Sequence, residues 1–186
     1  MEELQMILDD TREQMEKAID HLENELSKIR AGKASPDMLS GVMVDYYGVK
    51  TPINQTASIN SQDAKTLVIK PFDKSMLQEI EKGILGANIG VTPQNDGDFI
   101  RIVLPPLTEE RRKELVKSVN RHGEETRVSV RNIRRDAMHQ VKDLLKEGLS
   151  EDMEKDAEQD IQKMTDDYTD KVNRHLSQKE EEIMKV

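Results

Sequence analysis

Residues 108–146 have the sequence TEERRKELVKSVNRHGEETRVSVRNIRRDAMHQVKDLLK, and this stretch decides the fold. Its core-facing positions recur at helical spacing, at Leu115, Val119, Thr126, Val130, Ile133, Ala137, Val141 and Leu144. Thr108 suits the N-cap, because Glu109 and Glu110 then lie at the positive end of the helix dipole. The stretch therefore predicts one helix of about 60 Å, at about 1.5 Å per residue, which Gly148 ends.

Two further helices are expected on either side of this one. Residues 2–30 place apolar side chains at spacings of three, four or seven, at Leu4, Leu8, Met15, Ile19, Leu22, Leu26 and Ile29. Ser150 begins another helix, with a stripe at Met153, Ala157, Ile161, Met164, Tyr168, Val172, Leu176 and Ile183. A short turn joins residues 108–146 to this last helix, so the two must run antiparallel. Packing all three helices together buries every stripe.

Residues 31–105 have a different pattern. They contain β-rich runs at residues 42–46 and 66–70, a weaker strand candidate at 55–59, and a strand at 99–104 after the turn sequence Gln94-Asn95-Asp96-Gly97. Ser75 is expected to cap a short helix between the strands. The sequence thus predicts an α+β protein: a long antiparallel three-helix bundle, residues 1–30 plus 106–186, with a small β/α/β domain inserted at residues 31–105.

The two chain crossings between these domains contain residues that interrupt regular structure. Gly32 lies at the first and Pro105 at the second, and the crossing residues are Ala31, Gly32, Lys33, Leu104, Pro105 and Pro106. Two short connections predict a hinge that moves in few directions, although a rigid junction is an alternative.

Composition narrows the class of protein further. Charged residues make up 35% of the 186 residues and aromatic residues only 3%, which is typical of long solvated helices. Cysteine is absent, which excludes disulfides and thiolate metal sites. No run approaches the ~18–20 apolar residues that span a bilayer, and the first ten residues lack the apolar block of a signal peptide. We therefore expect a soluble, cytoplasmic protein without a membrane partner.

Motifs that carry chemistry are missing from the sequence. The P-loop, GxGxxG, HExxH and GxSxG patterns do not occur. The histidines, His21, His122, His139 and His175, lack ligand spacing and are interpreted as surface or interfacial residues. Asp96-Gly97-Asp98 lacks the other ligands of a calcium loop and is interpreted as a turn. We expect neither catalysis nor a cofactor or metal.

Positive charge is concentrated in one block, although the whole chain carries a net charge of −9. Residues 107–149 hold 11 basic and 8 acidic residues. Arg127, Arg131, Arg134, Arg135 and Lys142 lie within one arc of about 100° on the helix, roughly 125° from the apolar stripe. The arc should face solvent. Between positions 127 and 142 only Asp136 is acidic, and it is expected to point away.

This basic stripe predicts a surface that binds RNA, because a guanidinium can bind a phosphate through two parallel hydrogen bonds. A solvated helix face and a surface for an acidic protein partner remain alternatives. Tryptophan is absent and Tyr46 and Tyr47 lie in the inserted domain, so recognition would be of RNA backbone and shape rather than of stacked bases. A coiled-coil adaptor that self-associates is a rival interpretation, and an enzyme is a weak third.

Five long motifs occur in the chain, and together they cover both predicted domains. They are Lys28-Ile29-Arg30-Ala31-Gly32-Lys33-Ala34-Ser35-Pro36, Asp45-Tyr46-Tyr47-Gly48, Pro71-Phe72-Asp73-Lys74-Ser75, Leu104-Pro105-Pro106-Leu107-Thr108-Glu109-Glu110-Arg111-Arg112 and Val130-Arg131-Asn132-Ile133-Arg134-Arg135-Asp136-Ala137. In order and spacing they resemble the bacterial ribosome recycling factor family, over essentially the whole chain.

The resemblance implies an L-shaped monomer of about the size of a tRNA. Its bundle would bind the large (50S) subunit of the 70S ribosome after termination, through large-subunit rRNA. Elongation factor G with GTP would then act on the inserted domain, release mRNA and tRNA, and split the subunits, with the chain as a lever that performs no chemistry itself.

The resemblance also assigns individual residues. Arg131 and Arg134 match the family's RNA-contacting arginines, and Arg30 and Lys33 match basic residues near the hinge. The family's Asp-Ala-Asn run is Asp136-Ala137-Met138-His139 here, so no contact beyond Ala137 is carried over.

Overall fold

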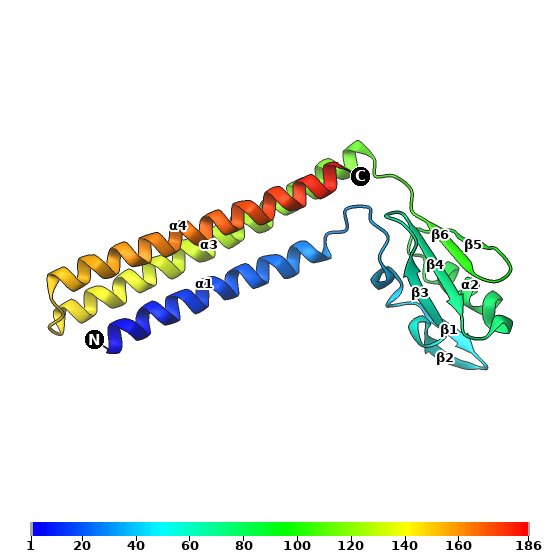
Figure 1. The fold of residues 1–186 in the computed structure, drawn as a ribbon, viewed down its shortest axis with the longest axis horizontal. Coiled ribbons are helices and arrows are strands. Elements are labelled where there is room, and N and C mark those ends of the chain that lie inside the picture. The colour runs from blue at the N-terminus through cyan, green and yellow to red at the C-terminus, as the bar shows by residue number, and fades with distance from the viewer. Residues whose placement is uncertain (1, 186) are drawn as a thin grey trace. The chain divides into compact units, whose positions relative to one another are not determined.

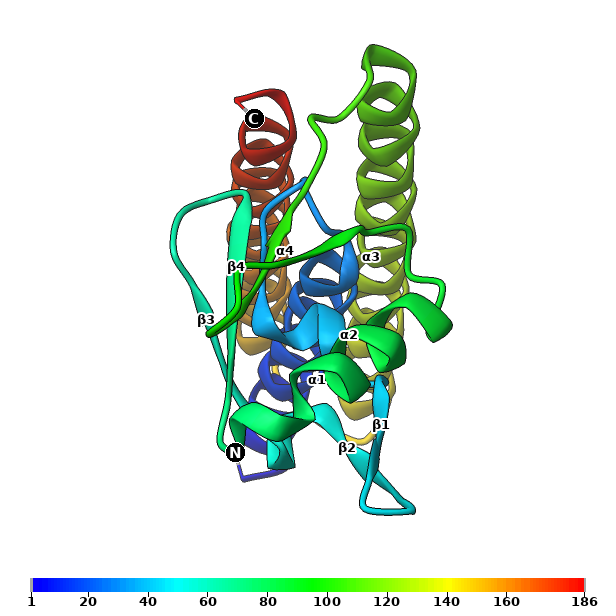
Figure 2. The ribbon, with the colours of Figure 1, turned by 90° about the vertical axis from the view of Figure 1, so that its right-hand side faces the viewer.

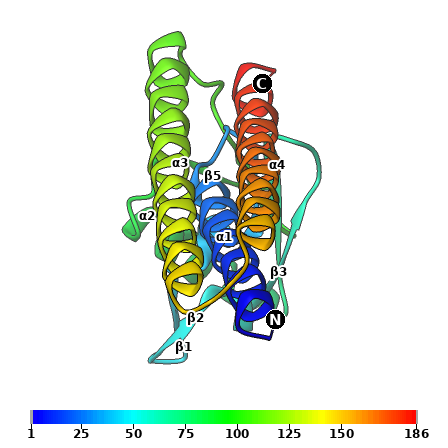
Figure 3. The same cartoon turned by 90° about the vertical axis from the view of Figure 1, so that its left-hand side faces the viewer.

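Three long helices form a bundle in the computed structural model, which describes residues 2–185 (Figure 1). They are α1 (Glu2–Lys28), α3 (Glu109–Lys146) and α4 (Glu151–Met184). Each of the three packs on the other two, as the view from the end that carries the α3–α4 turn shows (Figure 3). α3 and α4 run antiparallel, and the predicted antiparallel bundle is confirmed.

Local chemistry fixes where α3 and α4 begin and where the turn between them lies. The Thr108 hydroxyl accepts a hydrogen bond from the N–H of Arg111 at 3.2 Å, and the Ser150 hydroxyl accepts one from the N–H of Met153 at 3.3 Å. Both side chains satisfy N–H groups that have no partner within the helix. Gly148 ends the first of the two helices with a φ of +113°, a conformation that favours glycine. The predicted cap at Thr108, the predicted helix start at Ser150 and the predicted stop at Gly148 are confirmed.

The bundle core consists of the predicted stripes, with Leu8, Ile29, Ile133, Leu144, Met153 and Met164 only half-buried. Two buried threonines, Thr11 and Thr165, donate their hydroxyls to the carbonyls of Ile7 and Ile161 one turn earlier. At Gly123 the α3 backbone lies against Leu176 of α4, because a Cβ there would come within 2.3 Å of the Leu176 Cδ1. The absence of a side chain at this glycine therefore allows close helix packing.

The inserted residues form two small antiparallel sheets and one helix. The elements are β1 (Met43–Tyr46), β2 (Val49–Pro52), β3 (Ala57–Ser61), β4 (Thr66–Pro71), α2 (Leu77–Gly86), β5 (Pro93–Asn95) and β6 (Ile100–Val103). β1 pairs with β2, and the larger sheet has the order β3–β4–β6–β5. Ile69 at the centre of β4 lies opposite Ile59 and Ile100, and it is fully buried. α2 packs beside β1 (Figure 2), and the α+β class is confirmed.

Several details of this unit differ from the sequence prediction. β2 and β5 were not predicted, and the weak strand candidate lies two residues later, at Ala57–Ser61. The cap expected at Ser75 is wrong: Asp73 is the capping residue, and its Oδ1 accepts the Ser75 N–H at 2.9 Å. The reason is that a 3₁₀ turn, Lys74–Met76, precedes α2. The turn at Gln94–Gly97 is present, with the Asp96 N–H donating to the Phe99 carbonyl at 3.0 Å.

The chain divides into two compact units. One comprises the described residues through Ala31 together with Thr108–Lys185, and the other is Gly32–Leu107. At the first crossing Gly32 has a φ of +74° and Lys33 is exposed. At the second, Leu104 is buried in the core of the small unit and its N–H donates to the Lys65 carbonyl at 2.8 Å. Pro105 and Pro106 are exposed, whereas Ala31 is buried.

Candidate nucleic-acid interface

Four of the five stripe cations line one surface groove of the bundle. Arg131, Arg134, Arg135 and Lys142 extend from α3 around a groove of about 590 Å³, which Asn132, Met138, His139 and Glu158 complete. The four cations share a face because, apart from the adjacent Arg134 and Arg135, their positions differ by three, four, seven, eight or eleven residues, close to whole helical turns. Glu158 is the one lining residue from α4. The groove can therefore hold an anion that spans more than one turn of α3.

The stripe side chains differ in how far they reach into solvent. The side chains of Arg131 and Arg135 are 60% and 66% exposed, and Lys142 is also exposed. Arg127 is only 30% exposed, and Arg134 is half-buried. Arg127 and Arg134 contact α4, so α4 covers one edge of the arc that was predicted to face solvent.

Neutral amides on α4 hold these two half-buried arginines. The Arg134 Nε donates to the Gln162 Oε1 at 2.8 Å, and the Arg127 Nη2 donates to the Asn173 Oδ1 at 2.6 Å. Gln162 is itself fixed, because its Nε2 donates to Asp166 at 2.9 Å. An amide oxygen orients a guanidinium without cancelling its charge, so these contacts position the arginines and leave them cationic.

Glu124, which lies outside residues 127–142, contacts two arginines of the stripe through its carboxylate. Glu124 accepts from the Arg131 Nη2 at 2.8 Å through Oε1 and from the Arg127 Nη1 at 3.4 Å through Oε2. The hydrogen bond from Arg131 holds the pKa of Glu124 below its ordinary value. Asp136, which is expected to point away from the arc, does not line the groove, although its Oδ1 lies 4.0 Å from the Nε of the adjacent Arg135.

Sequence reasoning missed Glu124, Gln162 and Asn173 for different reasons. Glu124 lies three and seven residues before Arg127 and Arg131, so helical spacing alone would have placed it on the stripe. It was missed because the prediction considered acids only between positions 127 and 142. The two amides leave no such signal, because they reach the stripe from a different helix.

The remaining predicted residues lie elsewhere. Arg30 is exposed just beyond the end of α1, and Lys33 is exposed in the small unit; neither lines the groove. Of the four histidines only His139 does so. Within residues 2–185 no group of three or more His, Cys, Asp or Glu side chains is arranged to hold a metal ion. No helix in this described range is long and apolar enough to cross a membrane.

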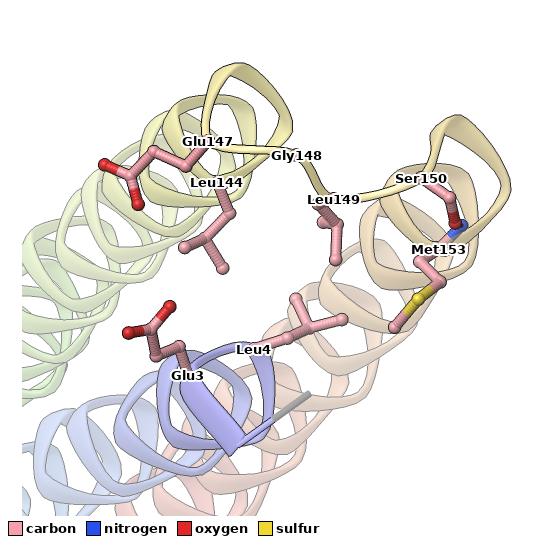
Figure 4. A pocket seen from close by; sticks show the side chains of 8 residues that line it. All are labelled: Glu3, Leu4, Leu144, Glu147, Gly148, Leu149, Ser150 and Met153. Atoms are coloured by element: carbon pink, nitrogen blue, oxygen red, sulfur yellow. The ribbon is translucent and has the colours of Figure 1, made fainter.

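A second hollow, at the tip of the bundle, has the opposite character (Figure 4). It measures about 380 Å³ and is lined by Leu4, Leu144, Leu149 and Met153, with Gly148, Ser150 and the carboxylates of Glu3 and Glu147. Among residues 2–185 no Lys or Arg lines it, and its two carboxylates would repel phosphate. The α3 groove is therefore the better candidate for binding nucleic acid.

Comparison with known proteins shows that the chain matches one protein family. A family model described as "Ribosome recycling factor" matches residues 22–184. The ribosome-recycling factor of Flavobacterium psychrophilum is 54% identical over 185 residues, covering 100% of this chain and 99% of the relative. The Bacillus subtilis factor is 50% identical over 181 residues, covering 97% and 98% of the two chains.

Two solved structures match all or nearly all of the chain. A solution structure of the ribosome recycling factor is 40% identical, with a TM-score of 0.71 and 100% of both chains covered. The second shows the T. thermophilus ribosome recycling factor and the E. coli elongation factor G bound to the E. coli post-termination complex. Its recycling factor is 44% identical, with a TM-score of 0.59 and 97% and 98% of the chains covered.

Proposed function

The chain belongs to the ribosome recycling factor family, and on that premise we propose that it recycles ribosomes after termination. It binds the large subunit of the post-termination 70S ribosome. With elongation factor G and GTP it then promotes release of mRNA and tRNA and separation of the subunits. The T. thermophilus relative, which is bound with elongation factor G to a post-termination complex, supports this assignment.

The observation that carries the proposal is the cationic groove on α3. Arg131, Arg134, Arg135 and Lys142 surround it, and Arg127 continues the same face by one further turn. We propose that these five side chains bind phosphates of large-subunit rRNA. Arg30 and Lys33 add phosphate contacts near the crossings. A long helix that presents cations at successive turns suits a backbone whose phosphates repeat regularly.

The factor acts mechanically in this proposal. GTP hydrolysis belongs to the elongation factor, so this chain needs no nucleophile, general base or metal. Bundle docking fixes one unit on the ribosome, and the elongation factor moves the small unit about a hinge at the crossings. Because Leu104 is packed in the small unit, the movable part of the second crossing is Pro105-Pro106. Gly32 and Lys33 form the movable part of the first.

The factor works as a cytoplasmic monomer. Most of the apolar stripe residues of all three helices are buried within one chain, so little of any stripe is left to pair with a second copy. A monomer mass in sedimentation equilibrium supports this arrangement, whereas concentration-dependent dimers would favour the coiled-coil adaptor instead.

Ribosome binding by Arg134→Ala tests the proposal. The variant should bind 70S ribosomes more weakly in co-sedimentation while its thermal unfolding stays close to that of the parent chain. If about five phosphates are neutralised, log affinity falls against log salt with a slope of about −4, and the variant's slope is shallower by about 1.

Arg111→Ala is the matched control. Arg111 is an exposed arginine on the same helix, paired with Glu114 at 2.8 Å, and it lies outside the groove. If Arg134→Ala binds as the parent does throughout the salt titration, the groove is not the RNA-binding surface.

A further inference from the structure

Glu124 occupies the stripe in the way that a bound phosphate would. Its two carboxylate oxygens accept from two guanidiniums, those of Arg131 at 2.8 Å and Arg127 at 3.4 Å. The side chain is 57% exposed, so the contact lies at the surface and is open to displacement. A phosphate oxygen that approaches the Arg131 Nη2 needs the same N–H donors that Glu124 now accepts from.

We propose that Glu124 competes with RNA phosphate for Arg131 and Arg127 and thereby sets how tightly the factor holds the ribosome. The inference rests on the proposed function, because it concerns the affinity of that same surface. To bind phosphate, the two arginines must leave Glu124, whose negative charge then faces the incoming RNA. Glu124 thus weakens binding in two ways, by occupying donors and by repelling phosphate.

The contrast with Arg134 gives the stripe two kinds of arginine. Arg134 is held by the neutral Gln162, so its charge is available to RNA from first contact. Arg131 and Arg127 share the Glu124 carboxylate, which offsets part of their charge until that contact breaks, while Asn173 also holds Arg127. Exposed ion pairs are weak, so Glu124 reduces affinity without blocking binding. This suits a factor that must leave the ribosome after each round.

Glu124→Gln tests the inference, and the neighbouring residue provides a matched control. Glu125 is 64% exposed and carries the same charge, but it lies 3.4 Å from the His122 Nδ1 and lines a hollow between α1 and α3. Glu125→Gln therefore makes the same change in net charge on a different face of α3. Both variants are compared with the parent chain for binding to 70S ribosomes across a salt titration, together with dissociation rates.

Glu124→Gln should bind about 3–10-fold more tightly at low salt and dissociate more slowly, with the difference shrinking as salt rises. Glu125→Gln should stay within about 2-fold of the parent. Glu124→Ala should change affinity in the same direction as Glu124→Gln, which shows that the effect comes from losing the carboxylate. Circular dichroism checks that each variant is folded.

Two results would overturn the inference. If Glu124→Gln and Glu125→Gln tighten ribosome binding equally, the effect comes from net charge and not from the contact of Glu124 with the arginines. If Glu124→Gln binds ribosomes more weakly than the parent chain, Glu124 is a positioning group for Arg131. Failure of the proposed function looks different: the parent chain would not bind ribosomes, or Arg134→Ala would bind as well as the parent.

Discussion

Gly123 is the position where one methyl group should disturb the bundle most. In Gly123→Ala the new Cβ would lie 2.3, 2.8 and 3.1 Å from the Cδ1, Cδ2 and Cγ atoms of Leu176. Rotation about χ2 moves the methyl groups of Leu176 but leaves Cγ close to the new Cβ, so relief requires a change in χ1 of Leu176 or a small shift of α4. Leu176 is only 4% exposed, and the surrounding core offers no room for the displaced side chain.

The expected size of the effect follows from two opposing contributions. Overpacking a close-packed core costs about 1–3 kcal/mol, and contact with three atoms puts this site near 3 kcal/mol. Alanine favours a helix over glycine by about 1 kcal/mol, which offsets part of that cost. Gly123→Ala should therefore destabilise the bundle by about 2 kcal/mol and lower the Tm by about 4–8 °C.

A double-mutant cycle with Leu176→Ala isolates the clash. Once the leucine is shortened, only the helix preference remains, so Gly123→Ala should then stabilise the chain by about 1 kcal/mol. The assay is urea unfolding followed at 222 nm. This signal reports mainly the bundle, whose helices have 27, 38 and 34 residues against 10 in α2.

One result of this double-mutant cycle would refute the clash between Gly123→Ala and Leu176. If Gly123→Ala has the same effect on stability in both backgrounds, α3 and α4 do not approach each other at this glycine. The glycine would then be explained by local chain conformation alone.

Two further predictions concern the ionisation of one tyrosine and the motion of the two units. Tyr168 donates to the Glu16 Oε2 at 2.6 Å, and burial raises the pKa of Tyr168 to about 12, so its contribution to stability is complete below about pH 10 and lost towards about pH 12. Tyr168→Phe should be about 1 kcal/mol less stable at neutral pH and should lose less stability in that alkaline window; an identical alkaline loss in urea unfolding would contradict this. Because the chain lacks cysteine, fluorophores attached through Gln159→Cys and Asn54→Cys, both exposed, can report the distance between the units. A hinge gives a broad distribution of single-molecule transfer efficiencies, and one narrow peak would indicate a rigid junction.

Features set by local chemistry were predictable from the sequence. Thr108, Gly148 and Ser150 act on groups within a few residues of themselves, and their roles follow from capping rules. The helical stripes were equally clear, because their period persists for many turns.

Short elements that depend on a partner strand were not predictable in this way. β5 has three residues and begins with Pro93, so little in its sequence favours a strand, and β6 pairs with it through Ile102 and Ile100. β2 follows a two-residue turn at Tyr47-Gly48, where φ is +51° and +85°. A tyrosine is unusual at the first position of such a turn. Tyr47-Gly48 is therefore only a weak sequence signal for a hairpin.

The candidate site likewise contains some residues that could be predicted from the sequence and others that could not. The cations were found because they share one helix face, and Glu124 was within reach of the same reasoning. Gln162 and Asn173 could be found only once the rotation of α4 against α3 was known.

The small unit interrupts the bundle between Ala31 and Thr108, and this affects the order in which a newly made chain can fold. α1 leaves the site of synthesis first, but its partners follow only after roughly 80 further residues, a separation that slows their meeting. Gly32–Leu107 is contiguous and can complete its core in the meantime. α3 can cover part of the apolar stripe of α1 first, but Ile183, in the final turn of α4, is fully buried, so the bundle core is incomplete until α4 has been made almost to its end. That interval is when the nascent chain most needs protection from aggregation.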